Sequence, residues 1–382
     1  MRKASPRFIF LALVLLALTS ILFLELAAKI PAPLVAVLLL ASVWSLGPAL
    51  LFRSESLRNC ALLCSSLLFG LAVFEFCMFF VSKSEIIVTK TTPEVWRQLA
   101  TDVGSLPIPN TATRFEEFLD GREIADVTYR IDGKGLREIS AAEQSRPHKV
   151  VFFGDSFMFG HGVENDQTLP YYFVQEAGGT FEGFNFAGEG WGPHQMLREI
   201  ENGFVRRVAG KPDLAIYEAI PDHLRRVAGR APWEDGPQYE LCRGDDACYS
   251  GPFHSSWYAA CRSTVDKSWT GKFVEAHFTQ LSQPSDIPIF LAVLKKTRSL
   301  LEESGTRFVI VLWDQNELAR TMMRVLRENQ FEVIALSSIF PGSDLTKYPI
   351  TQLDRHPSPA ANKAIATYLW RHMGEHSIAP AH

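Results

Sequence analysis

The sequence predicts an α/β fold: a flavodoxin-like three-layer α/β/α sandwich with a parallel sheet, preceded by three transmembrane helices. Three observations support this prediction. From residue 149 onward, short apolar runs alternate with amphipathic stretches, a pattern typical of parallel strands joined by helices. The first of these apolar runs ends in a glycine-rich turn. Three longer apolar runs near the start each approach the roughly 20 residues that a helix needs to cross a bilayer.

The long apolar runs are Phe8–Leu24, Leu34–Phe52 and Cys60–Val81. The first run alone would also fit a signal peptide. Two more runs follow it without a small-residue cleavage pattern, which favours retained helices. We therefore expect residues 1–82 to form a three-helix transmembrane anchor whose partner is the lipid bilayer.

Positive charges around these runs predict the orientation of the anchor. Arg2, Lys3 and Arg7 precede the first run, and Arg53 and Arg58 lie between the second and third runs. The positive-inside rule places both groups in the cytoplasm. Three spans then carry the rest of the chain across, so we expect a multi-pass protein of a bacterial inner membrane with a periplasmic or extracellular C-terminal domain.

Residues 83–125 are predicted to be a membrane-proximal connector. Pro93, Pro107 and Pro109 interrupt this segment, and no long hydrophobic period persists in it. Glu94–Leu99 is compatible with a short amphipathic helix.

Residues 126–382 carry the α/β alternation. Strands are expected where apolar runs are short and continuous, and helices where caps and a 3.6-residue period occur. The predicted strands are Lys149–Phe153, Phe181–Ala187, Leu214–Ile220, Arg307–Leu312 and Phe331–Leu336. The predicted helices are Leu169–Ala177, Pro193–Val208, Ile287–Ser304, Glu317–Asn329 and a last helix from Pro359 to about Met373.

An insertion at about residues 224–286 breaks this rhythm. It is rich in aromatic residues, namely Trp233, Tyr239, Trp257, Tyr258 and Trp269. Such side chains would either stack on sugar rings or cover the site as a lid. The alternative is a small satellite core beneath a long loop.

Charge and cysteine content narrow the function. The chain beyond residue 82 holds 32 basic and 39 acidic side chains, a balance that disfavours nucleic-acid binding. Cys242 and Cys248 flank a polar loop short enough to close as a disulfide, which leaves Cys261 over and the pairing open. No nearby histidine has ligand spacing, so neither a metal site nor another cofactor is expected.

The stretch Val150–Val163 is the strongest functional signal. Its apolar run ends in Gly154-Asp155-Ser156, and more glycines follow. A strand followed by so tight a turn projects one side chain at the carboxyl end of a parallel sheet, where α/β folds bind their ligands. Ser156 is therefore a candidate nucleophile, although these residues also form ordinary turns.

The end of the chain supplies a candidate base. Asp354-Arg355-His356 precedes the last predicted helix, which Ser358 caps. A serine hydroxyl becomes a good nucleophile when a histidine takes its proton, and a carboxylate orients that histidine. A solvated Asp-x-His turn is the alternative interpretation.

Together these segments resemble the SGNH (GDSL-type) esterase and acyltransferase superfamily. The resemblance includes the lead-in Tyr129–Arg137 and the segments Gly160–Val163, Thr168–Pro170 and Asn185–Gly192, of which the last is similar to the second block of the family. It covers roughly residues 125–375, with a poorly matched middle. It implies Ser156 as nucleophile, His356 as general base and acid, and Asp354 as the group that orients His356.

The resemblance also implies an oxyanion hole, and here the chain departs from the family. The N–H groups of Ser156 and Gly188 would contribute, but Ala187 stands where the family usually has glycine. The asparagine of the third block is missing, because the strand ending at Ile220 continues into Pro-Asp-His223. His223 would either replace that asparagine as a donor or simply cap the strand end.

What the resemblance implies about function follows from these residues. The expected activity is a serine-dependent esterase or O-acyltransferase acting on O-acyl groups, often acetyl, of cell-envelope or secreted glycans. A transferase would need a membrane partner that supplies the acyl group. The alternative, favoured by the missing asparagine, is a non-catalytic carbohydrate-binding or assembly component of an envelope complex.

Overall fold

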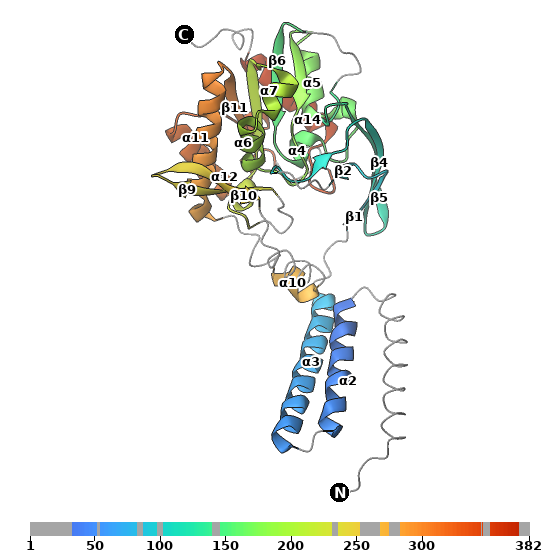
Figure 1. Ribbon diagram of the computed structural model, residues 1–382. Helices are drawn as coiled ribbons and strands as arrows, with labels where there is room; N and C mark the ends of the chain where they lie inside the picture. The colour runs from blue at the N-terminus through green and yellow to red at the C-terminus, as the bar shows by residue number, and fades with distance from the viewer. Residues whose placement is uncertain are drawn as a thin grey trace. The chain divides into compact units, whose positions relative to one another are not determined.

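A computed structural model of the 382-residue chain describes residues 33–51, 54–81, 87–97, 102–139, 146–230, 236–252, 268–274, 283–344, 346 and 352–373. The chain divides into two compact units (Figure 1). The first unit comprises Met1–Ser84 and Ser255–Thr279, and the second comprises Glu85–His254 and Gln280–His382. The predicted span Phe8–Leu24 lies outside the described residues, as do Trp233, Trp257, Tyr258 and Cys261.

Two apolar helices form the described core of the first unit, α2 (Pro33–Leu51) and α3 (Glu55–Val81). Ser42 and Ser65 hold them together by reciprocal bonds, since each hydroxyl donates to the other residue's carbonyl oxygen, at 3.0 and 2.9 Å. Such bonds satisfy polar groups that an apolar setting would otherwise leave unpaired.

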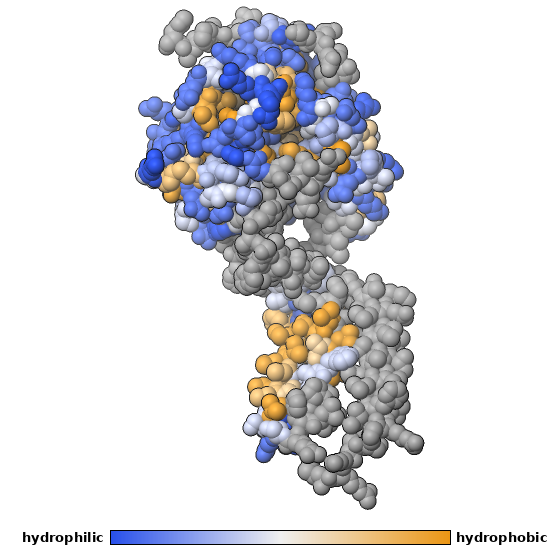
Figure 2. Space-filling view, viewed as in Figure 1, coloured by the Kyte–Doolittle hydropathy of each residue, from blue (hydrophilic) through white to orange (hydrophobic). Residues whose placement is uncertain are grey.

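The exposed surface of α3 is apolar (orange in Figure 2). Among the described residues, one helix is long and apolar enough to cross a membrane, Glu55–Met78. Glu75 of α3 accepts hydrogen bonds from the Ser268 hydroxyl and from the backbone N–H groups of Trp269 and Thr270, which begin the short helix α10 (Trp269–Val274). The single charge of the third predicted span is thus satisfied within this unit.

The second unit is built on a five-stranded parallel sheet in the order β12-β11-β8-β6-β7. This confirms the predicted α/β fold with a parallel sheet. The strands are β6 (His148–Phe153), β7 (Phe181–Asn185), β8 (Leu214–Ala219), β11 (Arg307–Leu312) and β12 (Glu332–Ala335).

Helices cover both faces of this sheet, because successive strand residues point to opposite sides. Val150 and Phe152 pack in one core cluster with α5 (Leu169–Glu176) and α14 (Pro359–Met373). Val151 and Phe153 pack in a second cluster on the other face. The helices of that face are α6 (Pro193–Glu201), α7 (Phe204–Ala209), α11 (Ile287–Glu303) and α12 (Glu317–Glu328).

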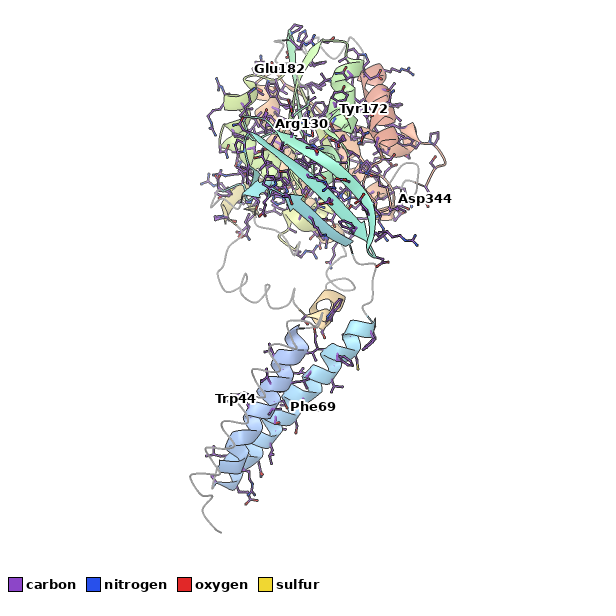
Figure 3. All side chains as sticks on the ribbon, turned by 90° about the vertical axis from the view of Figure 1, so that its right-hand side faces the viewer. Trp44, Phe69, Arg130, Tyr172, Glu182 and Asp344 are labelled. Atoms are coloured by element: carbon purple, nitrogen blue, oxygen red, sulfur yellow. A yellow bond between two sulfur atoms is a disulfide. The ribbon has the colours of Figure 1, made fainter. Side chains whose placement is uncertain are left out.

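Residues 87–131 differ from the predicted connector. They form a three-stranded antiparallel sheet, β1-β4-β5, and a two-stranded pair, β2-β3. The three-stranded sheet faces the viewer in Figure 3, where Arg130 of β5 is labelled. The bounds are β1 (Ile87–Thr92), β2 (Trp96–Arg97), β3 (Leu106–Pro107), β4 (Thr111–Leu119) and β5 (Arg122–Ile131). Trp96 therefore lies in a strand rather than in the expected amphipathic helix. Buried aromatic residues Phe115 and Tyr129 join this sheet to the α/β core.

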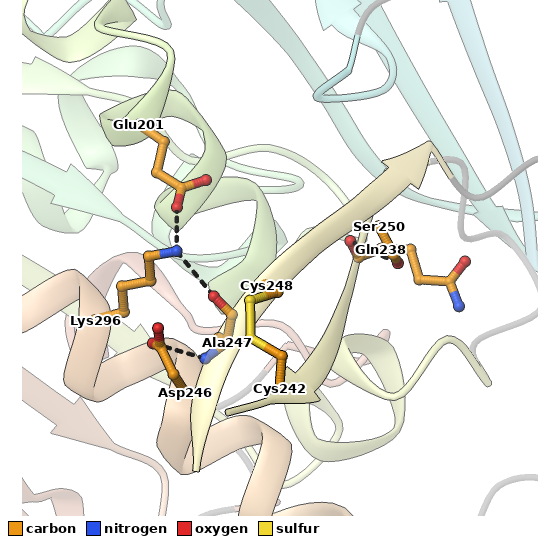
Figure 4. Close-up of a disulfide and its surroundings, with 8 residues drawn as sticks. All are labelled: Glu201, Gln238, Cys242, Asp246, Ala247, Cys248, Ser250 and Lys296. Atoms are coloured by element: carbon orange, nitrogen blue, oxygen red, sulfur yellow. Dashed lines mark hydrogen bonds and ion pairs between the residues drawn. A yellow bond between two sulfur atoms is a disulfide. The ribbon is translucent and has the colours of Figure 1, made fainter. Parts of the chain in front are cut away.

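The described part of the predicted insertion contains an antiparallel hairpin, β9 (Pro237–Cys242) and β10 (Asp246–Pro252). A disulfide links Cys242 to Cys248 across it (Figure 4). The hairpin packs against α11, where Lys296 donates to the Ala247 carbonyl and pairs with Glu201 of α6, both at 2.8 Å. The remaining elements are α4 (Ser156–Phe159), η1 (Asn165–Gln167), α8 (His223–Val227), η3 (Pro284–Asp286) and α13 (Leu336–Ile339).

Candidate active site

Ser156 is the first residue of α4, directly after the turn that ends β6. Gly154 adopts φ +157°, and a Cβ there would lie 2.8 Å from Met158 Cβ and 2.9 Å from Glu218 Oε2. Asp155 caps the helix by accepting from the Phe157 N–H at 2.9 Å. Glycine, cap and helix start together place the hydroxyl of Ser156 at the carboxyl end of the sheet.

His356 lies in a tight turn before α14. The Gln352 N–H donates to the His356 carbonyl at 2.7 Å, and Arg355 adopts φ +73° within this turn. Asp354 binds His356 twice: its Oδ1 accepts from the backbone N–H at 3.1 Å, and its Oδ2 lies 2.8 Å from Nδ1. The carboxylate thereby fixes both the backbone and the ring of His356.

The structure brings Ser156 and His356 together across 200 residues of chain. The distance from His356 Nε2 to Ser156 Oγ is 2.9 Å, within hydrogen-bonding range. Burial opposes ionisation of Asp354, but its hydrogen bonds to His356 outweigh this and lower the pKa of the carboxyl. An ionised Asp354 keeps a proton on Nδ1, so Nε2 is left to accept the hydroxyl proton of Ser156.

A network of buried charged side chains around Asp155 supports the turn that carries Ser156. Asp155 is fully buried, accepts from Arg226 Nη1 at 2.8 Å and lies 3.4 Å from His223 Nε2. Burial alone would raise the pKa of Asp155, but Arg226 and His223 outweigh it and hold the carboxyl ionised. Burial, with the charge of Asp155 nearby, raises the pKa of Glu218 well above its ordinary value. One carboxylate and one neutral carboxyl therefore lie side by side under Ser156.

The position of His223 does not fit the role of oxyanion donor, one of the two roles that the resemblance left open for it. Its side chain is fully buried, with Nδ1 2.6 Å from the Tyr217 hydroxyl and Nε2 facing Asp155. Burial lowers the pKa of this ring, in opposition to Asp155. The physical reason for its position is the cost of a buried carboxylate, which needs partners on several sides.

Gly188 does not fit the predicted role either, because its N–H already donates to the Gly154 carbonyl at 3.4 Å. A Cβ at Gly188 would lie 2.4 Å from the Trp191 ring, so this glycine is needed for packing. Gly190, two residues later, adopts φ +76° and lines the pocket that contains Ser156. Among the described residues of this loop, Gly190 is the better candidate for a backbone donor.

The pocket over Ser156 has a volume of about 500 Å³. Aromatic, charged and hydroxyl groups line it together with Ser156: Trp96, Ser105, His161, Glu189, Gly190, Trp191, Arg226 and His356. Its walls come from five segments far apart in sequence: the β2–β3 region, α4 with the turn after it, the loop after β7, α8 and the turn before α14. The pocket therefore presents aromatic and polar side chains together.

Sequence reasoning missed the residue that holds the loop after Ser156. Arg137, fully buried, donates through Nη1 to the Phe159 carbonyl at 3.1 Å and to the Gly160 carbonyl, and through Nη2 to the Val163 carbonyl at 2.6 Å. Its guanidinium stacks on the Tyr129 ring at 4.1 Å. Burial lowers the pKa of Arg137 to about 10, which still leaves it charged at neutral pH. The lead-in motif thus acts by clamping backbone carbonyls.

Three groups of described residues are close enough to share a metal ion: His161, Asp354 and His356; Asp155, Glu218 and His223; Cys242, Asp246 and Cys248. In the first group the imidazoles and the carboxylate already pair with one another, and in the second Arg226 binds the carboxylate. The two cysteines of the third group are joined as a disulfide. In each of the three groups, side chains that could bind a metal are thus already paired with other protein groups.

No known protein-family profile matches the chain, and no curated protein matches it in sequence. Similar solved structures include a lipolytic protein of the G-D-S-L family from Veillonella parvula, with 13% identity over 58% of this chain and 94% of that chain and a TM-score of 0.34. They also include TesA, with 12% identity over 59% and 98% and a TM-score of 0.36. A lipase from a goat rumen metagenome has 15% identity over 59% and 97% and a TM-score of 0.35.

Proposed function

We propose that this protein is a serine-dependent esterase or O-acyltransferase of the SGNH type. One observation carries the proposal: Ser156 Oγ, His356 and Asp354 form a continuous hydrogen-bonded chain, with steps of 2.9 and 2.8 Å, that opens on a polar pocket. This is the arrangement that activates a serine hydroxyl for attack on an acyl carbonyl.

The geometry supports a two-step acyl transfer. Ser156 Oγ bonds to the carbonyl carbon while its proton moves to His356 Nε2, and the carbonyl oxygen becomes an oxyanion. The C–O bond to the alcohol then breaks, and the departing alcohol takes the proton from His356. Water or an acceptor hydroxyl reverses these steps, so that the acyl group leaves as an acid or a new ester and Ser156 is regenerated.

The oxyanion would be held by backbone N–H groups. Ser156 is the first residue of α4, and the first N–H groups of a helix have no intrahelical acceptor. Gly190 lines the same pocket and would contribute the second donor. Each such donor is typically worth about 10²–10³ in rate, so a site with two of them still accelerates acyl transfer.

The proposed substrates are O-acyl, chiefly acetyl, groups on glycans of the cell envelope or secreted polysaccharide. The pocket supports this class because aromatic residues, Trp96 and Trp191, and polar residues, Glu189, Ser105 and Arg226, line it together. If the acceptor is a hydroxyl, a membrane partner would supply the acyl group.

The proposed setting is a bacterial inner membrane, with residues 1–82 as a three-helix anchor and the α/β domain on the periplasmic or extracellular side. Two observations support it: the apolar helix Glu55–Met78, and the disulfide Cys242–Cys248, since disulfides persist in oxidising compartments. Within this scheme residues 83–125 are part of the exported domain, and residues 126–382 carry the catalytic groups and the insertion.

The test uses the full chain in detergent. Wild type and Ser156→Ala are compared for release of p-nitrophenol from p-nitrophenyl acetate and of acetate from an acetylated glycan. Adding an unacetylated oligosaccharide together with p-nitrophenyl acetate distinguishes transfer, seen as an acetylated product, from hydrolysis. Activity that is equal in wild type and Ser156→Ala contradicts the proposal.

A second candidate is a non-catalytic glycan-binding component of an envelope complex. It is favoured by the absence of a side-chain donor at the end of β8, where His223 is turned into the core. This candidate predicts binding of the acetylated glycan with an affinity that Ser156→Ala leaves unchanged and no turnover of either ester.

A further inference from the structure

His161 lies five residues after Ser156, on the same turn. Its backbone N–H donates to the Ser156 carbonyl at 2.9 Å. The flanking glycines, Gly160 at φ +90° and Gly162 at φ +68°, permit the sharp change of direction, and the Gly162 N–H donates to the Tyr129 hydroxyl at 2.8 Å. The loop of the nucleophile thus returns a second imidazole to the site in a fixed position.

Both nitrogens of the His161 ring face carboxylates. Nδ1 lies 2.7 Å from Glu189 Oε1, and Nε2 lies 3.3 Å from Glu117 Oε1 and 3.7 Å from Asp354 Oδ2. An ionised carboxylate only accepts hydrogen bonds, so both ring nitrogens must carry protons for both bonds to form. The geometry therefore describes an imidazolium, and its side chain is only 10% exposed.

The ring of His161 stacks on the ring of His356. Their centroids are 4.1 Å apart and their planes 27° apart. Phe157 makes an edge contact with His356 at 5.2 Å, and Phe115 makes one with His161 at 4.8 Å. His356 is thereby contacted by a charged ring and an apolar ring as well as by Asp354.

We propose that His161 is a positioning residue for His356: a charged ring, clamped by Glu117 and Glu189, that holds His356 in the orientation that reaches Ser156. The proposal rests on the proposed function, because it concerns the same site. It also gives the sheet β1-β4-β5 a role, since Glu117 comes from β4. The sequence motifs include His161 in the segment Gly160–Val163 but give it no role, because its partners lie 44 and 28 residues away.

The charge of His161 has a consequence for pH dependence. Burial opposes the charge, but Glu189 and Glu117 outweigh burial and raise the pKa of His161 to about 10. Burial likewise opposes ionisation of Glu189, but His161 outweighs it and lowers the pKa of that carboxyl. His356 is thus contacted by the charged ring of His161 on one side and by the Asp354 carboxylate at Nδ1. The charged and titratable groups around His161 are Glu117, Tyr129, Arg137, Glu189, Asp354 and His356.

The test measures the rate at which a fluorophosphonate labels Ser156 in the full chain, as a function of pH. His161→Gln should lower the second-order rate constant about 10- to 100-fold, the cost of a small misplacement of a reacting group. In wild type the rate should fall as the pH approaches 10, where His161 loses its proton, and this alkaline decline should be absent in His161→Gln. His148→Gln is the matched control, because His148 also pairs with a carboxylate, Asp213 at 3.4 Å, but at the opposite end of β6.

A second variant distinguishes the effect of the charge of His161 from the effect of its ring. It also keeps the inference testable if His161→Gln does not fold. Glu117→Gln combined with Glu189→Gln keeps the imidazole in place but replaces both carboxylates by neutral amides of equal size. The ring then loses its proton near neutral pH, so this variant should also lack the decline near pH 10 while it retains more of the maximal rate.

The outcomes separate this inference from the proposed function. If wild type is labelled at Ser156 and both variants keep its rate and its pH profile, His161 has no positioning role while the esterase proposal stands. If wild type itself is not labelled, the proposed function fails, and the role of His161 fails with it.

Discussion

Two neighbouring strands, β6 and β8, end at the same edge of the sheet, but the residues that follow them have different roles. A position at this edge is therefore not enough to place a side chain in the site. The two strands pair in parallel and end at the same edge. After β6, Gly154 turns the chain so that Ser156 lines the pocket. After β8, the chain enters α8 and His223 is buried against Asp155.

The difference follows from the cost of burying a charge. Asp155 caps α4 from a fully buried position and requires partners that remain beneath the turn. Arg226 and His223, both of α8, provide them. The end of β8 therefore supports the turn that the end of β6 exposes. Substitutions at the two ends should separate an effect on rate from an effect on stability.

The largest effect is expected for His356, which contacts Ser156, and for Asp354, which orients His356. Replacing His356→Ala or Asp354→Asn should lower the rate of p-nitrophenyl acetate hydrolysis on the order of 10⁴-fold, because the base is lost or its ring holds the wrong tautomer. Thermal unfolding of the same variants in detergent checks that they are folded. Rates within tenfold of wild type would remove this pair from the mechanism.

Gly154→Ala tests how the turn after β6 is built. The new Cβ would lie 2.8 Å from Met158 Cβ at a φ that disfavours side chains, so the free energy of unfolding should fall by about 2–4 kcal/mol. Gly121→Ala is the control, because Gly121 also has a positive φ, +80°, but no atom within 4 Å of the added Cβ. Denaturant unfolding should show a clearly smaller loss for the control, and equal losses would mean that contact with Met158 is unimportant.

His223→Ala tests the end of β8. Loss of its contacts with Asp155 and the Tyr217 hydroxyl should lower the free energy of unfolding by about 1–3 kcal/mol. The rate of ester hydrolysis should change by less than the 10²–10³-fold that loss of an oxyanion donor costs, roughly tenfold at most. A stable variant with a hundredfold lower rate would return His223 to the oxyanion hole.

The two buried histidines should also give opposite pH dependences of stability. The pKa of His161 is raised to about 10, so its contribution is complete below pH 6.5 and is lost as the pH rises toward 10. The pKa of His223 is lowered, so stability falls as the pH drops below 6.5 and the unfolded state takes up the proton. Each contribution is at most about 1.4 kcal/mol per pH unit.

Unfolding midpoints measured from pH 5 to pH 10 check these signs. His161→Gln should flatten the alkaline side of the stability profile, and His223→Ala should flatten the acid side. A profile whose alkaline side is unchanged in His161→Gln would mean that His161 is neutral in the folded protein.

The parallel sheet could be predicted because its strands are buried on both faces and therefore consist of continuous apolar runs. The predicted strand Arg307–Leu312 and the predicted helix beginning at Pro359 match β11 and α14. The predicted helix boundaries differ from the observed ones where a helix is interrupted but the apolar pattern of the sequence continues. The predicted helix Pro193–Val208 is divided into α6 and α7 by Asn202 and Gly203.

The sheet β1-β4-β5 could not be predicted in the same way, because its inward positions are partly polar. Thr113 and Glu117 of β4 are buried beside Phe115, so the alternation of apolar and polar residues is blurred. Glu117 is buried because it pairs with His161, which is a tertiary contact that no local pattern reveals.

The sequence predicted the part of the candidate site whose chemistry depends on individual side chains. Ser156, Asp354 and His356 are the residues that the motifs indicated, and the structure brings them into one hydrogen-bonded chain. The hydrogen-bond donors of the oxyanion hole could not be assigned from the resemblance to the family. Burial and backbone hydrogen bonding decide which N–H group faces the pocket. In the structure the Gly188 N–H donates to the Gly154 carbonyl, and the side chain of His223 is buried.

Labelling of the intact protein with a fluorophosphonate, followed by peptide mass spectrometry, tests most directly whether Ser156 is an activated nucleophile. The account predicts one adduct in the folded wild type, on the peptide that contains Ser156, with labelling strongly slowed in His356→Ala and absent in Ser156→Ala. A folded wild-type protein that leaves Ser156 unmodified, under conditions in which a known serine hydrolase reacts fully, would contradict it.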